Sequence, residues 1–400
     1  MSARRVAVTG IGVVSALGND APSFWRSVSA GVTGIRPLRN LPAPLRFTCG
    51  AEAVEYDVSR HFSDKEASLL DRAAQFALVA AREAVHDAGI VFQPERSAVV
   101  TGCSVGGQNS MDEGFVDLYQ KGLPRVNPLM IPRVMGNAGA SHITMEMGIT
   151  GPAYTVSTAC ASSSHAIGQA CWMIRNGLAD AALTGGHEAV FSWGFLKAWE
   201  AMRVVSPDTC RPFAKDRRGM ILGEGGAMLV LEELEAARAR GARVYAEIIG
   251  FGMSADAHHI TQPSPEGAAR AMLGALRDGG IAGEDVGYIN AHGTGTPAND
   301  TTECRAIRLA FGAHADRLAV SSTKSMHGHA LGAAGALEAV ASILALHEGV
   351  LPPTANFTVR DPECDLDIIT GSARPGSALV ALSNSFAFGG LNAVLAFRKL

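Results

Sequence analysis

The feature that most constrains the fold is the alternation of short apolar runs with helix-like segments along nearly the whole chain. This alternation is typical of α/β folds, in which helices cover the faces of a sheet. We expect strands at residues 6–10, 98–101, 153–158, 181–185, 227–231, 245–250, 286–290, 318–322, 378–382 and 393–398. We expect helices at residues 71–88, 161–176, 234–240, 267–278, 301–311 and 333–347. Since 47% of the 400 residues are apolar and 18% are charged, the chain can bury an extensive core.

Two short patterns recur in the later part of the chain. Residues 6–12 and 246–252 are each an apolar run that leads into Gly-x-Gly, and residues 156–160 and 320–324 each read as a strand followed by a helix of small residues. Glycine after a strand is common, so this signal is weak by itself. It is explained by two related halves, 1–245 and 246–400.

The Gly-x-Gly at Gly10 and Gly12 does not predict a dinucleotide site. No third glycine follows at the required spacing, and no acidic residue ends a second strand where a ribose would need one. A tight turn is the better explanation.

Charge, hydropathy and cysteine usage exclude several classes of protein. The net charge is -4 without a Lys/Arg-rich run, so a nucleic-acid partner is not expected. No uncharged apolar stretch is long enough to cross a bilayer, and the basic N-terminus leads into a glycine-broken strand rather than a signal peptide. Seven dispersed cysteines without a CxxC pair argue against a disulfide framework and a zinc site. We expect a soluble cytoplasmic protein without a catalytic metal.

Cys160 stands between the predicted strand 153–158 and the predicted helix 161–176. At such a corner the helix amides and the positive end of the helix dipole favour a thiolate. A cysteine placed there can act as a nucleophile. The alternative is a buried structural thiol, since free cysteine is among the most buried residue types.

Two later segments can supply proton handling and hydrogen-bond donors to a nucleophile. In residues 290–300, His292 follows an apolar run and enters a loop with Thr294 and Thr296. In residues 322–329, Lys324 and His329 precede a helix of small residues. Each segment also has a structural explanation, because a histidine beside a strand is often a hydrogen-bonded core residue and glycine-rich loops often only turn.

Cys160, His292, Lys324 and His329, in these settings, resemble the active-site residues of the β-ketoacyl-acyl-carrier-protein synthases, the condensing enzymes of fatty acid and polyketide assembly. The elongating synthase II type is the most similar, and the resemblance extends over nearly the whole chain, to the segment 383–392. It implies the α/β thiolase fold, in which two similar halves form five layers, αβαβα. It also implies a dimer with the acyl pocket near the interface.

The resemblance implies a two-step condensation. Cys160 takes an acyl group from an acyl carrier protein, and a malonyl-carrier protein then loses carbon dioxide and attacks the resulting thioester. His292 and His329 donate hydrogen bonds to the enolate oxygen. The backbone amides of Cys160 and Phe388 form the oxyanion hole, and Phe386 belongs to the same gating loop. No cofactor is implied, because the substrates ride on the phosphopantetheine of the carrier protein.

Other positions carry supporting roles by the same resemblance. Lys324 orients the two histidines, with Glu303 as its ion partner and Asp300 in support, since a buried lysine needs a partner. Thr294 and Thr296 bind the pantetheine arm. The residues that match a buried structural cation site of some relatives are Asn290, Glu338, Ser383 and Asn384. Two other features are expected to stay outside the chemistry, namely His327 and the adjacent pair His258 and His259.

The chain departs from the family pattern around the acyl pocket. Ala387 and Leu391 stand where fatty acid synthases of this type usually have Gly and Thr, so the gate has less backbone freedom and its opening is altered. Trp199 and Val105 replace acyl-pocket residues and alter the accepted chain length or shape. Ordinary repacking of the core is the alternative for these two.

The docking surface for the acidic carrier protein must be basic. The residues that fit such a surface are Lys65, Arg203, Lys215, Arg217 and Arg218. Ser68 and Leu69, however, replace positions that are basic in housekeeping enzymes. This difference favours a dedicated carrier protein in a specialised pathway, such as those of the nodulation-type or polyene-type condensing enzymes.

Three alternatives within the fold are less consistent with the residues. A thiolase needs a second cysteine near the C-terminus, where this chain has Phe386 and Phe388, and an initiating synthase uses Cys-His-Asn. A silent chain-length factor typically lacks the cysteine that stands here at Cys160. We expect an active synthase that forms a homodimer, or a heterodimer with a chain-length factor.

Overall fold

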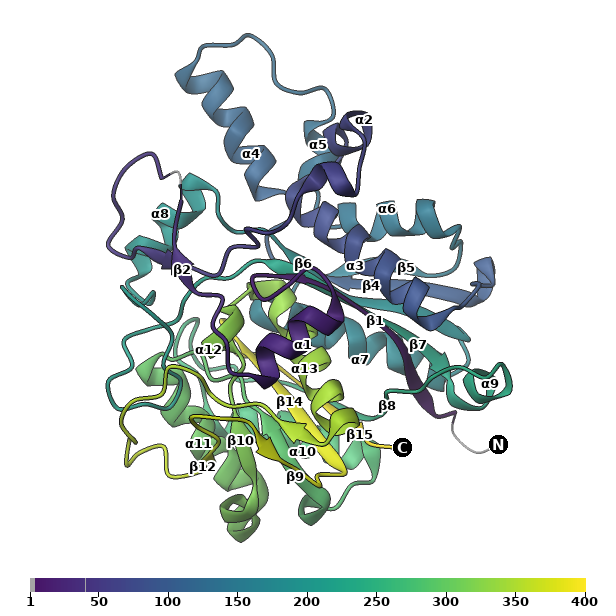
Figure 1. The fold of residues 1–400 in the computed structure, drawn as a ribbon, viewed down its shortest axis with the longest axis vertical. Helices are drawn as coiled ribbons and strands as arrows, with labels where there is room; N and C mark the ends of the chain where they lie inside the picture. The colour runs from purple at the N-terminus through teal and green to yellow at the C-terminus, as the bar shows by residue number, and fades with distance from the viewer. Residues whose placement is uncertain (1–3, 40) are drawn as a thin grey trace.

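The computed structural model describes residues 4–39 and 41–400 as one large mixed sheet with helices on both faces (Figure 1). The elements before residue 245 are β1 (Val6–Ser15), α1 (Ala21–Ser29), β2 (Arg36–Pro37), β3 (Cys49–Gly50), α2 (Asp64–Ser68), α3 (Arg72–Ala88), β4 (Ser97–Gly102), α4 (Gln108–Phe115), α5 (Met130–Val134), α6 (Ala138–Met147), β5 (Ala153–Val156), α7 (Ser162–Arg175), β6 (Ala181–Glu188), α8 (Trp193–Met202), β7 (Gly225–Glu233) and α9 (Leu234–Ala239). The later elements are β8 (Ala246–Ala255), α10 (Pro265–Gly279), β9 (Val286–Asn290), α11 (Pro297–Phe311), β10 (Ala319–Ser321), α12 (Lys324–His327), α13 (Ala334–Glu348), β11 (Val350–Leu351), β12 (Asp367–Ile368), β13 (Arg374–Pro375), β14 (Val380–Ala387) and β15 (Leu391–Arg398).

The main sheet consists of two half-sheets with the same strand order. β5-β4-β6-β7-β1 in the first corresponds to β10-β9-β14-β15-β8 in the second, with the same parallel and antiparallel pairings. Only three residue pairs join them, between the starts of β1 and β8. The layers are α3 with α6, the first half-sheet, α7 with α13, the second half-sheet, and α10 with α11 (Figure 1). This is the expected α/β thiolase fold in five layers.

The Gly-x-Gly pairs let helices approach the sheet closely. A Cβ on Gly12 would lie 1.9 Å from the carbonyl oxygen of Ala80 in α3, and one on Gly252 would lie 2.1 Å from that of Ala271 in α10. Both glycines lie inside long strands. The expected tight turn at residues 10–12 is therefore wrong, and the repeat reflects the same helix packing in both halves.

The second repeat is offset from the expected alignment. In the first half, the 3-10 turn Ala159–Ala161 leads directly into α7, and in the second half the 3-10 turn Leu331–Ala333 leads into α13. Ala159 and Leu331 both have left-handed φ angles, 49° and 45°. Gly332 is thus the counterpart of Cys160, whereas Lys324 and His329 belong to an extra segment that follows β10.

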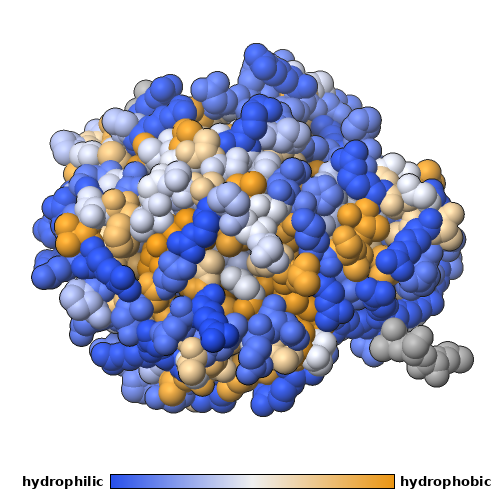
Figure 2. All heavy atoms as spheres, turned by 60° about the horizontal axis from the view of Figure 1, so that its bottom comes forward, coloured by the Kyte–Doolittle hydropathy of each residue, from blue (hydrophilic) through white to orange (hydrophobic). Residues whose placement is uncertain are grey.

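Every expected strand and helix is present, and the structure adds several helices. The helices that were not expected are α1, α2, α4, α5, α6, α8 and α12; each has ten residues or fewer, so the helical spacing of apolar residues is too short to stand out in the sequence. The segment Leu331–Glu348 has the length and hydropathy of a membrane span, yet 89% of it is buried inside the protein as the core helix α13. The face at the bottom of Figure 1 is largely hydrophilic, with apolar side chains between the charged ones (Figure 2).

Candidate active site

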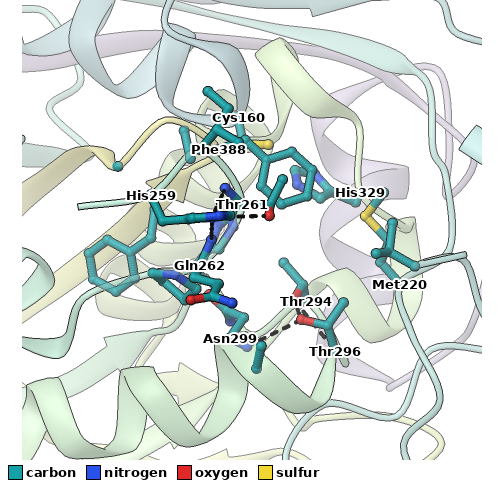
Figure 3. A pocket seen from close by; sticks show the side chains of 18 of the residues that line it. Cys160, Met220, His259, Thr261, Gln262, Thr294, Thr296, Asn299, His329 and Phe388 are labelled. Carbon is teal, nitrogen blue, oxygen red and sulfur yellow. Dashed lines mark hydrogen bonds between the residues drawn. The ribbon is translucent and has the colours of Figure 1, made fainter. Parts of the chain in front are cut away.

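A cavity of about 110 Å³ brings together residues from distant parts of the chain. Figure 3 shows Cys160 and Phe388 at one end of it and Thr294, Thr296 and Asn299 at the other. The remaining residues that line it are Trp199, Val204, Met220, His259, Ile260, Thr261, Gln262, Pro263, His292, Ala298, His329, Phe386, Ala387 and Gly390. The cavity is mostly apolar and carries a thiol and two imidazoles at its inner end.

Cys160 sits on a strained turn ahead of α7. Ala159 has a left-handed φ of 49°, and the Ser162 hydroxyl both donates to the Ala159 carbonyl (2.6 Å) and accepts from the Thr158 amide (2.9 Å). This turn leaves the Cys160 thiol 7% exposed, with its own amide and that of Phe388 beside the sulfur.

Burial disfavours the thiolate form of Cys160. It raises the pKa of the thiol to about 11, although the Lys324 charge and the Phe388 and Cys160 amides oppose this. The amides thus favour the thiolate as expected, and desolvation outweighs them.

His329 presents its Nε2–H as a hydrogen-bond donor. Its Nδ1 accepts from the Leu331 amide at 3.2 Å, so the proton of the neutral ring lies on Nε2. Leu331 has a φ of 45°, a conformation that brings its amide back toward the histidine. Burial, and then the Lys324 charge, hold the pKa of His329 well below its usual value.

His292 has the same protonation, set by a different partner. Lys324 Nζ lies 3.2 Å from His292 Nδ1, so the ammonium donates to Nδ1 and the ring proton lies on Nε2. Burial and the Lys324 charge hold the pKa of His292 well below its usual value. The His292 and His329 rings meet edge to face, with their centroids 5.3 Å apart. The cavity thus holds two neutral imidazoles that donate hydrogen bonds.

The ion partner of Lys324 is Glu338 of α13, not Glu303 as expected. Both side chains of the Lys324–Glu338 pair are fully buried and in direct contact. Glu303 instead accepts from the amides of His292 (2.8 Å) and Gly293 (2.7 Å) and holds the histidine loop. Its contact with Asn384 Nδ2, at 3.1 Å, ties that loop to β14.

Replacing Glu338 with alanine is expected to lower the free energy of unfolding by about 3–5 kcal/mol, because it leaves the Lys324 ammonium buried without a partner. Urea denaturation followed by circular dichroism measures this change. The double variant Lys324→Met/Glu338→Leu removes both charges and is expected to recover most of the loss. A double variant as unstable as Glu338→Ala contradicts the ion-pair explanation.

Three of the four residues matched to a cation site carry buried oxygens without partners in the described part of the chain. Glu338 Oε2, Ser383 Oγ and Asn384 Oδ1 make no hydrogen bond within the described part of the chain, and Asn290 bonds to Thr323 Oγ1 at 3.2 Å. Carboxylate, amide and hydroxyl oxygens are the ligands of hard cations. This donor set fits a structural cation, which would stabilise the segment around Lys324.

Two other histidines differ in position: His327 lies away from the cavity, and His259 lines it. His327 is fully buried, does not line the cavity, and contacts Thr323 Oγ1 through Nε2 at 3.0 Å. His259 lines the cavity mouth, where its Nδ1 accepts from the amides of Thr261 (3.1 Å) and Gln262 (3.2 Å). Among residues 4–39 and 41–400, no group of three His, Cys, Asp or Glu side chains is placed to hold a metal.

An aromatic series borders the gate. The Phe388 ring stacks on Trp199 with centroids 6.3 Å apart, and Phe195 meets Trp199 edge-on at 6.0 Å. Phe386 lies beside His292, with centroids 6.0 Å apart. The expected role of Trp199 in the pocket thus agrees with its position.

Val105 does not reach this cavity. It is absent from the lining, and its amide donates to Glu188 Oε1 at 3.3 Å. The place of Val105 in the acyl pocket, which is expected near the dimer interface, stays a prediction.

The gating loop is fastened to a second loop that the sequence did not single out. The Gly389 amide donates to the Ile260 carbonyl at 2.8 Å, and the Asp256 amide donates to the Gly390 carbonyl at 2.9 Å. Gly389 and Gly390 have left-handed φ angles of 83° and 71°, so the loop keeps glycine freedom next to Ala387. The feature that could have identified this second loop in the sequence is its position directly after β8. There it lies at the same sheet edge as the loop that carries His292.

The loop after β9 is held for ligand contact by its own side chains. Thr294 Oγ1 and Thr296 Oγ1 lie 2.9 Å apart at the cavity mouth. Asp300 accepts from the amides of Phe213 (2.8 Å) and Gly295 (3.2 Å), and burial raises its pKa to about 6. Asp300 therefore supports the loop rather than touching a ligand.

Arg217 is not available for docking. Its side chain is 5% exposed and contacts Asp361 directly, with Asp300 Oδ2 at 3.7 Å from its Nε. The expectation that Arg217 belongs to the basic docking surface is wrong, because it cross-links two loops in the interior. The remaining members are exposed: Lys65 on α2, Arg203 after α8, Lys215, and Arg218, which pairs with Asp208 at 3.0 Å.

Comparison with known proteins agrees with the arrangement of residues found in the cavity. Residues 3–237 match the family model "Beta-ketoacyl synthase, N-terminal domain", and residues 245–358 match "Beta-ketoacyl synthase, C-terminal domain". The chain is 47% identical to Nodulation protein E of Rhizobium sp. (strain N33), over 99% of this chain and 100% of that protein. It is 44% identical to 3-oxoacyl-[acyl-carrier-protein] synthase 2 of Synechocystis sp., over 99% and 98%. The solved structure of the ishigamide ketosynthase/chain length factor covers all of both chains with a TM-score of 0.95 and 38% identity.

Proposed function

Because the chain belongs to the β-ketoacyl synthase family, we propose that it is an acyltransferase that elongates an acyl chain held on Cys160 by decarboxylative Claisen condensation with malonyl-acyl carrier protein. This proposal rests on the arrangement of residues at the inner end of the cavity. There a thiol with two amides beside it lines the same space as two neutral histidines.

The first half-reaction is acyl transfer to Cys160. The sulfur attacks the thioester carbonyl, the bond to the pantetheine sulfur breaks, and the thiol proton ends on the released pantetheine. Negative charge develops on the carbonyl oxygen, which the amides of Cys160 and Phe388 stabilise. Cys160 is then an acyl thioester.

The second half-reaction is decarboxylation and condensation. The bond between the malonyl carboxylate and Cα breaks, carbon dioxide leaves, and the electron pair forms an enolate whose oxygen accepts from His292 and His329. The enolate carbon attacks the Cys160 thioester and expels the thiolate, which water reprotonates. The product is a 3-oxoacyl chain, two carbons longer, on the carrier protein. Neutral imidazoles suit this task because both keep a fixed N–H donor.

The carrier protein supplies the pantetheine arm, so no separate cofactor is needed. Thr294 and Thr296 line the mouth through which the arm enters and offer hydroxyls to its amides. Such an enzyme works where the carrier proteins are, and we place it in the cytoplasm.

A protein partner is expected on the face formed by α4, α5 and α6. Eight of the twenty exposed large hydrophobic residues fall between residues 115 and 145. β5 next to them is the edge of the main sheet. We propose a homodimer through this face. A heterodimer with a chain-length factor is the alternative, since the ishigamide relative carries one.

Arg203→Ala is expected to raise KM for the carrier protein about threefold with little change in the melting temperature, because exposed rim charges contribute modestly to binding. Arg217→Ala is expected instead to lower the melting temperature, since it leaves Asp361 and Asp300 unpaired in the interior. Steady-state kinetics and thermal unfolding of both variants separate the two roles. If Arg217→Ala raised KM as much as Arg203→Ala and did not lower the melting temperature, Arg217 would belong to the docking surface.

The proposed function is tested by giving the purified protein acyl-carrier proteins of increasing chain length together with malonyl-carrier protein. Mass spectrometry of the carrier is expected to show the 3-oxoacyl product. Housekeeping and pathway carrier proteins are compared side by side, and a strong preference for the latter supports a specialised pathway. Absence of product with every acyl chain and carrier contradicts the proposal.

A further inference from the structure

Glu188, the last residue of β6, has a carboxylate that receives five hydrogen-bond donors. Oε2 accepts from the amides of Ser104 (2.8 Å) and Gly332 (3.0 Å) and from the Ser104 hydroxyl. Oε1 accepts from the Cys103 thiol (3.3 Å) and the Val105 amide (3.3 Å). The residue is fully buried. It therefore fastens the end of β4 in the first half to the turn before α13 in the second.

The carboxyl oxygens of Glu188 accept from donors alone. Each of its hydrogen-bond partners is an N–H, O–H or S–H. Burial raises the pKa of Glu188, and the bonds from Ser104, Cys103 and Val105 oppose that rise. Glu188 makes no ion pair among residues 4–39 and 41–400. The donors therefore fix the backbone segments that carry them around one carboxyl group.

The turn that Glu188 holds is the one that sets the protonation of His329. The Gly332 amide binds Glu188, and the preceding residue, Leu331, has a φ of 45° and donates to His329 Nδ1. A left-handed leucine persists only where the surroundings enforce it. Glu188 supplies one such constraint, one residue beyond the strained position.

We propose that Glu188 is a positioning residue that keeps the Nε2–H of His329 aimed into the cavity. This inference rests on the proposed function for its kinetic part. Glu188 fixes the turn whose next amide binds His329, and His329 donates to the enolate, so Glu188 acts on the second half-reaction.

Glu188→Gln tests the proposal with nearly no change in shape. Because each oxygen accepts at least two donors, the new NH2 faces donors in either orientation. Malonyl-carrier decarboxylation is expected to fall about 100-fold, the cost of misplacing one catalytic group, while acylation of Cys160 stays within about threefold. The 15N chemical shifts of the His329 ring report which ring nitrogen carries the proton, and they are expected to show loss of the fixed Nε2–H form.

Glu83→Gln is the matched control. Glu83 is also a largely buried carboxylate that accepts two amides, those of Val13 (2.8 Å) and Ala21 (2.7 Å), and it lies outside the cavity. Its variant is expected to change neither the rate of malonyl decarboxylation nor the 15N chemical shifts of His329. If Glu188→Gln does not fold, Ser104→Ala removes one donor and is expected to shift the same two readouts by a smaller amount.

Three outcomes overturn the proposal: decarboxylation and acylation that fall together, decarboxylation that stays unchanged, or 15N chemical shifts of His329 that do not move. A wild-type protein that decarboxylates no malonyl-carrier protein instead contradicts the proposed function. The chemical shifts are read without substrate, so they remain informative in that case.

Discussion

Cys160→Ala is expected to abolish the acyl adduct and to lower condensation by at least about 10³-fold, because no other thiol among the described residues lies in the cavity to hold the chain. Of the seven cysteines, Cys160 is the one that lines it. Intact-protein mass spectrometry after exposure to acyl-carrier protein measures the adduct, and product formation measures turnover.

The control for this experiment is Cys49→Ala. Cys49 is the most accessible of the other cysteines and lies on β3, away from the cavity. Its variant is expected to acylate like the wild type. An adduct that persists in Cys160→Ala, or vanishes in Cys49→Ala, contradicts the assignment of the nucleophile. Cys160→Ala should still decarboxylate malonyl-carrier protein, since both histidines and their partners remain.

His292→Ala and His329→Ala are each expected to lower malonyl decarboxylation by about 10²–10³-fold, the usual cost of one oxyanion donor. Acylation of Cys160 should survive in both, because the amides of Cys160 and Phe388 serve that step. In the double variant, the fold-decrease in decarboxylation should be smaller than the product of the two single decreases. The reason is that both imidazoles act on one oxygen and share Lys324 as a neighbour.

His327→Ala is the matched control, a buried histidine two residues from His329 that does not line the cavity. Carbon dioxide release from malonyl-carrier protein and the rate of adduct formation are followed in parallel, with circular dichroism to check folding. Loss of acylation in His292→Ala would show that this histidine serves the first half-reaction and is not confined to stabilising the enolate.

Much of the fold was predictable because apolar residues recur at a regular spacing in its strands and helices. The buried strands of both half-sheets are short apolar runs, and helices such as α3 and α10 begin at side-chain caps and end at left-handed glycines. The cysteine and histidine segments were also predictable as neighbours, because each follows a strand at the same edge of its half-sheet. α4 and α5 lacked any such period.

The incorrect predictions concern which side chains contact each other rather than where helices and strands lie. Glu303 and Glu338 are both buried acids on helices, and only packing decides that α13 brings Glu338 to Lys324 while Glu303 caps the histidine loop. Arg217 looks like a docking residue in sequence, yet Asp361, 144 residues away, takes it into the interior. The rise in the pKa of Cys160 could not be predicted from the sequence, because burial of a side chain is a tertiary property.

The duplicated turn explains why a molecule with two similar halves has one reaction centre. Gly332 occupies in the second half the place of Cys160 in the first, but a Cβ there would lie 2.5 Å from Glu188 Oε2 and 2.6 Å from the Ser104 nitrogen. No side chain fits, and the amide that would face a substrate oxygen already faces an internal carboxylate. The turn at Gly332 is therefore a counterpart of the Cys160 turn in which Glu188 and Ser104 fill the space for a side chain. A cysteine introduced at position 332 would meet these two residues rather than a thioester.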